Sequence, residues 1–365
     1  MKIVDMTLVR CTSPLSQPFK TALRTVHAVD SIVVKLIGDT GLIGWGEAAP
    51  TLVITGDSLG GIYSALNEPL RHVVVGREIE ELEAILVDVE RAVVGNTSAK
   101  AAIDMALYDL FCQRYQLPLF RLLGGTRSEI ETDVTISVDK VEQMTRTATQ
   151  RVASGFTTLK IKVGKDWKND LARIRSIREA VGPDIAIRVD ANQGWTPKQA
   201  VHIIEQMEKQ ALGVELVEQP VARHDIDGLA FVTHNVATPI MADESLFSAR
   251  DAVTLLQRRA VDLLNIKLMK CGGIRQALHI VGIAEAYDIA CMVGSMMESK
   301  LSVTAAAHLA AAKHNIAFTD LDAPLWLARD LAVGGITYDG KRITLPPAPG
   351  LGITALRDDA IVTSD

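Results

Sequence analysis

Thr158-Leu159-Lys160-Ile161-Lys162 is a short strand-like run, and a helical stretch separates it from a second run, Ile185-Ala186-Ile187-Arg188-Val189. This alternation of a β-branched run with a helical stretch occurs eight times after Arg127. The runs occupy residues 133–138, 158–163, 185–189, 214–217, 239–241, 263–266, 290–293 and 316–319. They repeat at roughly 25 to 28 residues, close to the roughly 30 residues of one strand–helix unit in a closed α/β barrel. We therefore predict an α/β protein with a (β/α)8-type barrel.

An open, doubly wound sheet is the alternative to a closed barrel for this alternation. Eight evenly spaced units favour closure. No dinucleotide fingerprint of the form GxGxxG follows the first run, and Cys271-Gly272-Gly273 is too short a match to count as one. The barrel is therefore the fold that we expect.

The residues on either side of the barrel predict a second, smaller domain. Val29 to Ile37 alternates like a strand, and the turn Asp39-Thr40-Gly41 leads into another strand at Ile43 to Glu47. The apolar spacing then becomes helical from Ser58 to Leu123. We assign residues 1–126 to an α+β capping domain, 127–323 to the barrel, and 324–365 to a turn-rich C-terminal segment that returns to the cap.

The composition points to a small-molecule partner rather than to nucleic acid or a membrane. The net charge is −6 from 38 basic and 44 acidic residues, without a block of like charge. Four scattered cysteines give neither a disulfide framework nor zinc-finger spacing, which is typical of a reducing compartment. The N-terminus has no secretory apolar region, and no run is long enough to span a membrane. We expect a cytoplasmic protein.

Three acidic residues end consecutive strand candidates of the predicted barrel: Asp190, Glu218 and Asp243. Catalytic groups of such barrels lie where the strands end, so these carboxylates would converge at one mouth and repel each other unless a cation neutralises them. Oxygen ligands without histidine or cysteine favour Mg²⁺, with Mn²⁺ as a substitute. Separate salt bridges that close the barrel top are the alternative.

Three lysines lie beside these acids. Lys160 and Lys162 are two residues apart on one strand and so share a face, and Lys267 enters from the sixth strand, across the barrel. A cation and other ammonium groups nearby should lower the pKa of such a lysine toward the operating pH and suit it to proton abstraction. A metal and an ammonium could stabilise the enediolate that forms beside a carboxylate, and a base on each face predicts inversion of the carbon. Simple pairing of each lysine with one acid is the alternative.

The chain resembles the enolase superfamily, in its muconate-lactonizing-enzyme subgroup, through five ordered motifs. They are Lys160-Ile161-Lys162, Asp190-Ala191-Asn192, Val217-Glu218-Gln219-Pro220, Ala242-Asp243-Glu244-Ser245 and Asn265-Ile266-Lys267-Leu268-Met269-Lys270. The resemblance covers essentially the whole chain and implies an enolase-like modified TIM barrel with a cap. Within the subgroup the chain is most similar to dipeptide epimerases of the L-Ala-D/L-Glu type. This implies a magnesium-dependent isomerase of murein-peptide metabolism, and family members tend to be homo-oligomers.

The resemblance also implies roles for individual residues. Lys162 and Lys267 match the two acid/base lysines, and Lys160 matches the lysine that supports the enolate charge. The metal ligands would be Asp190, Glu218 and Asp243.

Substrate-binding roles follow from further matches. Asp320 and Asp322 match the acidic pair that holds the ammonium group of the dipeptide, although residues alone leave a helix N-cap role equally open for this pair. Arg24 matches the arginine that pairs with the glutamate side chain, whereas a lone loop arginine is more often a surface group. Thr135 and Met297 complete the predicted substrate contacts. The apolar loop at residues 51–57 is a candidate lid, and Glu298 is left without a role.

Two other hypotheses about the function of the site remain. The first keeps the fold and changes the substrate, as in N-succinylamino-acid racemase, o-succinylbenzoate synthase or muconate cycloisomerase. Arg24, Asp320 and Asp322 speak against it, because an N-acylated substrate has no ammonium for the acidic pair to hold. The second is a non-catalytic protein that captures dipeptides through the metal, for which opposed buried lysines would be an unneeded desolvation cost.

Overall fold

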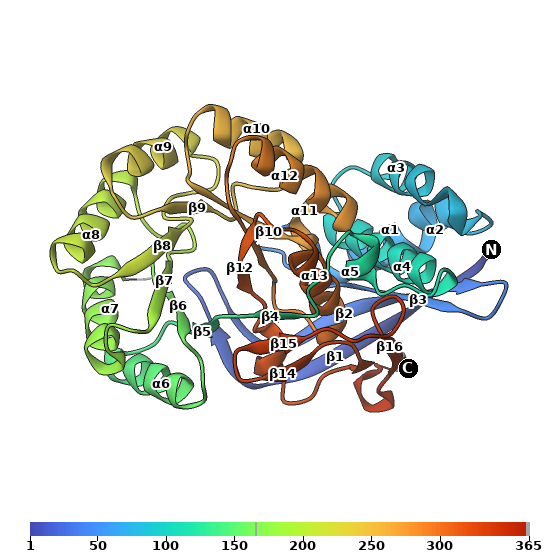
Figure 1. The fold of residues 1–365 in the computed structure, drawn as a ribbon, viewed down its shortest axis with the longest axis horizontal. Coiled ribbons are helices and arrows are strands. Elements are labelled where there is room, and N and C mark those ends of the chain that lie inside the picture. The colour runs from blue at the N-terminus through green and yellow to red at the C-terminus, as the bar shows by residue number, and fades with distance from the viewer. Residues whose placement is uncertain (165, 363–365) are drawn as a thin grey trace.

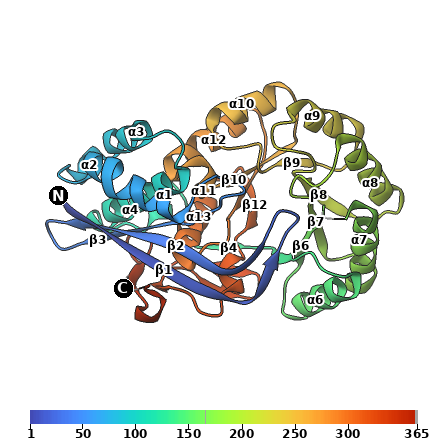
Figure 2. The ribbon, with the colours of Figure 1, turned by 180° about the vertical axis from the view of Figure 1, so that it is seen from behind.

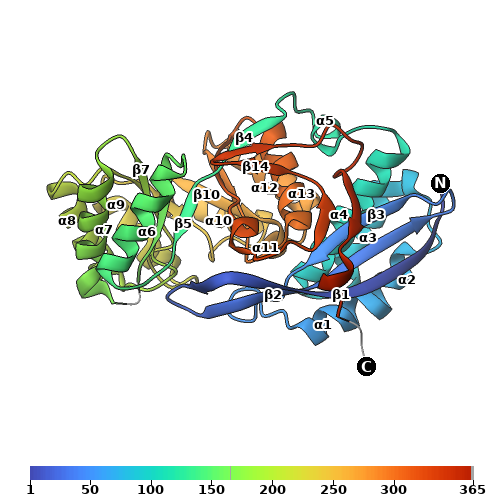
Figure 3. The same ribbon diagram turned by 90° about the horizontal axis from the view of Figure 1, so that it is seen from below.

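The computed structural model describes residues 1–164 and 166–362 and begins with a three-stranded antiparallel sheet. Its strands are β1 (Ile3–Lys20), β2 (Thr25–Gly38) and β3 (Ile43–Ala48). The turn predicted at residues 39–41 joins β2 to β3. The hairpin of β1 and β2 is long, and Figure 3 shows it running from the N-terminus toward the barrel. Its tip meets the barrel, where the Lys20 N–H donates to Ser137 Oγ at 3.0 Å and the Val138 N–H donates to the Lys20 carbonyl.

Helices cover one face of this sheet (Figure 1). They are α1 (Leu59–Ala65), α2 (Arg71–Val74), α3 (Leu82–Ala92), α4 (Thr97–Arg114) and α5 (Leu119–Leu122), with a π-helical turn at Leu66–Leu70 and a 3-10 turn at Ile79–Glu81. Helix α4 lies directly on β3. Gly46 makes this close approach feasible, because a Cβ atom at this position would lie 1.8 Å from the Ala102 carbonyl oxygen.

Eight parallel strands form the barrel sheet, in the order β12-β11-β10-β9-β8-β7-β6-β5. They are β5 (Val134–Ile136), β6 (Thr158–Lys162), β7 (Ala186–Asp190), β8 (Val214–Glu218), β9 (Ile240–Ala242), β10 (Leu263–Lys267), β11 (Cys291–Gly294) and β12 (Ile316–Asp320). The Asp133 N–H donates to the Thr319 carbonyl at 3.4 Å, which brings the two ends of the sheet together into a nearly closed barrel. The predicted barrel is confirmed, and each of the eight predicted runs overlaps one of these strands.

The barrel helices lie around the outside of the sheet, as Figure 2 shows from behind. They are α6 (Val141–Ala153), α7 (Trp167–Val181), α8 (Pro197–Lys209), α9 (Ile226–Asn235), α10 (Ala249–Gln257), α11 (Leu268–Cys271), α12 (Ile274–Ala286) and α13 (Lys300–Ala312). Inside the barrel, Leu216, Met241 and Met292 form a separate apolar cluster. Because side chains alternate along a strand, the residues two positions further along, such as Glu218 and Asp243, lie at the mouth beyond this apolar layer.

The C-terminal segment contacts both the cap and the barrel. It contains a 3-10 turn (Ala323–Trp326), β13 (Ala332–Gly334), β14 (Thr337–Asp339), β15 (Arg342–Thr344), β16 (Ile353–Leu356) and a 3-10 turn (Asp358–Ala360). Strand β15 pairs with β4 (Glu129–Glu131), and the Val362 N–H donates to the Arg10 carbonyl of β1. Residues 363–365 of the predicted segment lie outside the described residues, and the boundaries at 126 and 323 stay predictions.

Two buried carboxylates of the cap hold the first turns of two barrel helices. Glu47, on β3, accepts hydrogen bonds from the Ser299 hydroxyl and from the Ser302 N–H at the start of α13. Asp104, on α4, accepts from the N–H groups of Ile274 and Arg275 at the start of α12. Both helices follow barrel strands, so the cap is fixed relative to the barrel mouth. In the described part of the chain, no helix combines the length and the apolar composition needed to cross a membrane.

Candidate active site

Asp190, Glu218 and Asp243 converge at the barrel mouth, as the sequence predicted. Asp190 and Glu218 are the last residues of β7 and β8, and Asp243 directly follows β9. One carboxylate oxygen from each lies within 4.8 Å of the others, and all three residues are buried. Glu218 Oε1 accepts from Asn265 Nδ2 at 3.0 Å, and Glu218 Oε2 faces the Lys160 ammonium. Three buried carboxylate oxygens at this spacing fit a hard divalent cation.

The three lysines occupy the mouth beside this triad. Lys160 Nζ lies 2.7 Å from Glu218 Oε2 and 2.6 Å from Asp320 Oδ2, at the centre of the charged cluster. Lys162 Nζ lies 2.5 Å from Asp190 Oδ2. Lys267 Nζ lies 2.8 Å from Asp243 Oδ2.

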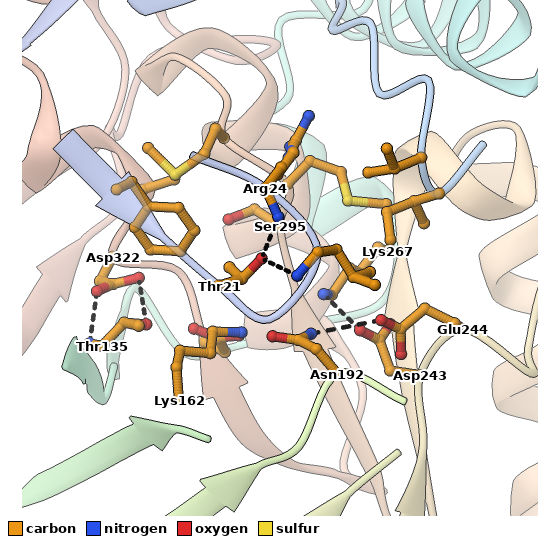
Figure 4. Close-up of a pocket in the computed structure, with 18 residues that line it drawn as sticks. Thr21, Arg24, Thr135, Lys162, Asn192, Asp243, Glu244, Lys267, Ser295 and Asp322 are labelled. Atoms are coloured by element: carbon orange, nitrogen blue, oxygen red, sulfur yellow. Dashed lines mark hydrogen bonds and ion pairs between the residues drawn. The ribbon is translucent and has the colours of Figure 1, made fainter. Parts of the chain in front are cut away.

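Lys162 and Lys267 come from opposite sides of the barrel. In the strand order, three strands separate β6 from β10 in either direction around the eight-stranded sheet. Figure 4 shows the two side chains on different sides of the pocket, with Lys267 next to Asp243. A substrate between them would therefore present one face to each lysine.

Burial and neighbouring charges shift the pKa values of the site residues in different directions. Burial raises the pKa of Asp190, but Lys162 and Lys160 lower it more, and the net shift is downward. Burial and the Asp190 charge raise the pKa of Glu218 to about 7. The lower lysine pKa expected from the sequence refers to the site with a divalent cation bound and stays a prediction. Burial lowers the pKa of Lys267, but the Asp243 carboxylate outweighs it, and the net shift is upward.

Asp320 and Asp322 lie at the end of β12 in two different environments. Burial raises the pKa of Asp320, but the ion pair with Lys160 outweighs this effect and lowers it to about 2. Asp322 instead accepts hydrogen bonds from the Thr135 N–H at 2.7 Å and from Trp326 Nε1 at 3.1 Å. Burial and the charge of Asp320 raise the pKa of Asp322. Asp322 precedes a 3-10 turn but makes no capping bond there, so the N-cap alternative does not describe this residue.

A pocket extends from the barrel mouth to two loops of the cap, the hairpin tip between β1 and β2 and the loop at residues 51–57. Its lining includes Arg24 and Thr21 from the tip of the β1–β2 hairpin, Ile54 from the loop at 51–57, and Met297 after β11. Burial lowers the pKa of Arg24, and among the described residues no carboxylate offsets that effect. The pocket therefore contains a half-buried guanidinium that lacks an acidic partner within the described chain.

The sequence reasoning missed three buried residues of this site. Lys270, fully buried, lies 2.5 Å from Asp243 Oδ1 and also donates to the Asn265 carbonyl at 3.1 Å. Asn192 lines the pocket and donates to Glu244 Oε1 at 3.3 Å. The third missed residue is this Glu244, which also lines the pocket. All three residues could have been found from the sequence, because Asn192, Glu244 and Lys270 belong to the motifs that contain Asp190, Asp243 and Lys267.

Glu298, which the sequence left without a role, is buried and directly follows Met297, which lines the pocket. Its carboxylate accepts from the Met296 N–H at 2.6 Å and from the Ser302 hydroxyl at 2.6 Å. Burial raises the pKa of Glu298 to about 7. These contacts fix the loop that carries Met297.

Two family descriptions match the two parts of the chain. Residues 3–124 match the mandelate racemase / muconate lactonizing enzyme N-terminal domain, and residues 143–360 match the enolase C-terminal domain-like family. The chain belongs to this family of enzymes. The resemblance seen in the sequence motifs is thereby confirmed.

Individual relatives are similar over their full lengths. The L-Ala-D/L-Glu epimerase of Clostridium acetobutylicum is 51% identical over 98% of this chain and 100% of that protein. A substrate-liganded complex of the L-Ala-D/L-Glu epimerase from Bacillus subtilis has a TM-score of 0.97 at 52% identity, covering 98% of this chain and 100% of that one. The dipeptide epimerase of Enterococcus faecalis V583, complexed with Mg and L-Leu-L-Tyr, has a TM-score of 0.93 at 44% identity, covering 97% of this chain and 100% of that one. These relatives confirm the prediction of an isomerase.

Proposed function

We propose that the protein is a Mg²⁺-dependent dipeptide epimerase that interconverts L-Ala-L-Glu and L-Ala-D-Glu. The reaction is a two-base 1,1-proton transfer at the α-carbon of the C-terminal residue. The observation that carries this proposal is the placement of Lys162 and Lys267 on opposed strands, each within ion-pair distance of the acidic triad. One lysine removes the proton from one face, and the other returns a proton to the opposite face.

The metal ligands in this proposal are Asp190, Glu218 and Asp243. Their oxygen-only chemistry favours Mg²⁺, with Mn²⁺ as a substitute. A bound cation would hold the α-carboxylate of the substrate and stabilise the negative charge that develops when the α-carbon loses its proton. Lys160, at the centre of the cluster, would support the same charge from the barrel interior.

The N-terminal ammonium and the glutamate side chain of the dipeptide would be bound by residues of opposite charge. Asp320 and Asp322 would bind the N-terminal ammonium, with Thr135 holding Asp322 in place through the 2.7 Å bond to its N–H. Arg24 would pair with the glutamate side chain, since a half-buried guanidinium is suited to a carboxylate. Met297 would line the pocket that surrounds the substrate.

The same charges argue against the N-acylamino-acid and cycloisomerase reactions of this fold. A substrate without an ammonium would offer no cation to Asp322, which is buried and, unlike Asp320, has no ion pair within the described residues. A purely binding protein has no use for two opposed lysines in its site. An epimerase for hydrophobic dipeptides would keep the lysines and the acidic pair but would have no use for Arg24.

The decisive experiment is proton NMR of the purified enzyme with Mg²⁺ and L-Ala-L-Glu in deuterium oxide. The expected result is loss of the glutamate Cα proton signal together with appearance of L-Ala-D-Glu. L-Ala-L-Leu and a chelated sample serve as controls. Absence of exchange with both dipeptides would overturn the epimerase proposal, while a preference for L-Ala-L-Leu would leave the epimerase reaction in place and overturn the glutamate substrate and the role of Arg24.

A further inference from the structure

The loop at residues 51–57, called the lid loop below, closes one side of the pocket. Ile54 and Val53 line the pocket, whereas the neighbouring Leu52 side chain is 66% exposed. The loop is fastened to the cap at its end, where Asp57 accepts a hydrogen bond from the Ser98 N–H at 3.0 Å. An apolar, partly exposed segment of this kind can move away from the pocket unless another contact holds it.

Arg223 provides that contact from the barrel. It lies in the loop between β8 and α9, and its Nη1 donates to the Ile54 carbonyl at 2.9 Å. Within the described residues this is the only hydrogen bond between the lid loop and the barrel. Arg223 does not line the pocket; its guanidinium contacts the Ile54 carbonyl of the lid loop and lies over the Phe247 ring, 5.8 Å from its centroid.

The backbone of Arg223 is held by the same loops that follow the acidic triad. Its N–H donates to Gln193 Oε1 at 2.9 Å, and its carbonyl accepts from the Ser245 hydroxyl at 2.8 Å. Ser245 is fixed in turn by Gln219 Nε2 at 2.8 Å. Gln193, Gln219 and Ser245 lie one to three residues beyond Asp190, Glu218 and Asp243. These hydrogen bonds hold the backbone of Arg223 against the loops that follow the acidic triad, and this fixes the position from which its guanidinium reaches the lid loop.

We propose that Arg223 is a positioning residue that keeps the lid loop closed over the dipeptide. The role in catalysis rests on the proposed function, but the closure itself does not. Its contact is with a backbone carbonyl, so replacement of Arg223 leaves the side chains of the pocket unchanged. Loss of one hydrogen bond of this kind should shift the closed–open balance by about fivefold, the equivalent of about 1 kcal/mol.

The test compares Arg223→Ala and Arg223→Lys with Arg258→Ala. Arg258 is a suitable control, because it is an exposed barrel arginine whose ion pair with Asp227 touches neither the lid loop nor the pocket. The first measurement is the rate of limited thermolysin cleavage within residues 51–54, mapped by mass spectrometry. We expect this rate to rise about fivefold in Arg223→Ala, to rise less in Arg223→Lys, which keeps one donor, and to stay unchanged in the control.

The second measurement is steady-state epimerisation. Arg223→Ala should raise KM about fivefold with kcat within twofold of the wild type, because the reacting groups stay in place. Equal cleavage rates and equal KM values in Arg223→Ala and Arg258→Ala would overturn the inference. If the wild type has no epimerase activity, the proposed function fails, and the cleavage rates alone decide the role of Arg223.

Discussion

Lys162 and Lys267 project toward one pocket from strands β6 and β10, which face each other across the barrel. Each ammonium is paired with a different acid of the triad, Asp190 for Lys162 and Asp243 for Lys267. Two groups of the same type, each anchored beside the metal site on its own side, are what an inversion of configuration requires.

Replacing either Lys162 or Lys267 by alanine should abolish epimerisation, because each direction of the reaction needs both proton transfers. Each single variant should still exchange the Cα proton with deuterated solvent from one stereoisomer of L-Ala-Glu and not from the other. Proton NMR of both diastereomers measures this. Lys209→Ala, which removes a surface lysine paired with Glu205, should leave both activities unchanged. A Lys267→Ala enzyme that epimerises normally would rule out the two-base mechanism.

Glu218→Gln should raise the Mg²⁺ concentration needed for half-maximal activity at least tenfold, because it removes one negative charge from the triad while keeping its shape. Titration of activity with Mg²⁺ after chelation measures the effect. Glu215→Gln is the matched control, since Glu215 lies on the same strand but is exposed and paired with Arg188. An unchanged Mg²⁺ requirement in Glu218→Gln would remove Glu218 from the metal site.

Periodicity made the barrel predictable from the sequence, because alternating apolar runs at a regular spacing have few compact solutions. The same pattern placed Lys162 and Asp190 at strand ends, where their convergence follows from geometry alone. The contact of Arg223 with Ile54 had no such signal, because it joins two loops that are 169 residues apart. The upward pKa shift that the Asp243 carboxylate gives Lys267 had no such signal either, because it depends on the summed charge of all neighbouring carboxylates, which spacing alone does not give.

His308 should make the protein less stable in acid. It lies fully buried in α13, where Nδ1 accepts from the Phe120 N–H at 2.9 Å, and burial lowers its pKa to about 3. The unfolded chain binds this proton near pH 6.5 and the folded chain does not, so stability falls as pH falls from about 6.5 toward 3, by at most about 1.4 kcal/mol per pH unit.

His308→Asn keeps an acceptor for the Phe120 N–H and removes the titration. Urea unfolding at pH 7.5 and at pH 4.5 should therefore show a smaller loss of stability in the variant than in the wild type. The comparison within each protein cancels any cost of the substitution that does not depend on pH. Equal losses in both proteins would show that His308 is not held neutral in the folded state.

Arg24 should decide which dipeptide the enzyme prefers. Its guanidinium lines the pocket without an acidic partner among the described residues, so a glutamate side chain would supply its first charged hydrogen bonds. Arg24→Leu should lower kcat/KM for L-Ala-L-Glu by roughly 10- to 100-fold, which corresponds to the loss of a charged hydrogen bond of about 1.5–3 kcal/mol. The same variant should retain or improve activity on L-Ala-L-Leu, and Arg24→Lys should fall between the two enzymes because it keeps the charge and loses the bidentate geometry. Equal losses on both dipeptides would mean that Arg24 supports the hairpin tip rather than the substrate, because a structural defect in that loop does not distinguish a carboxylate from a methyl group.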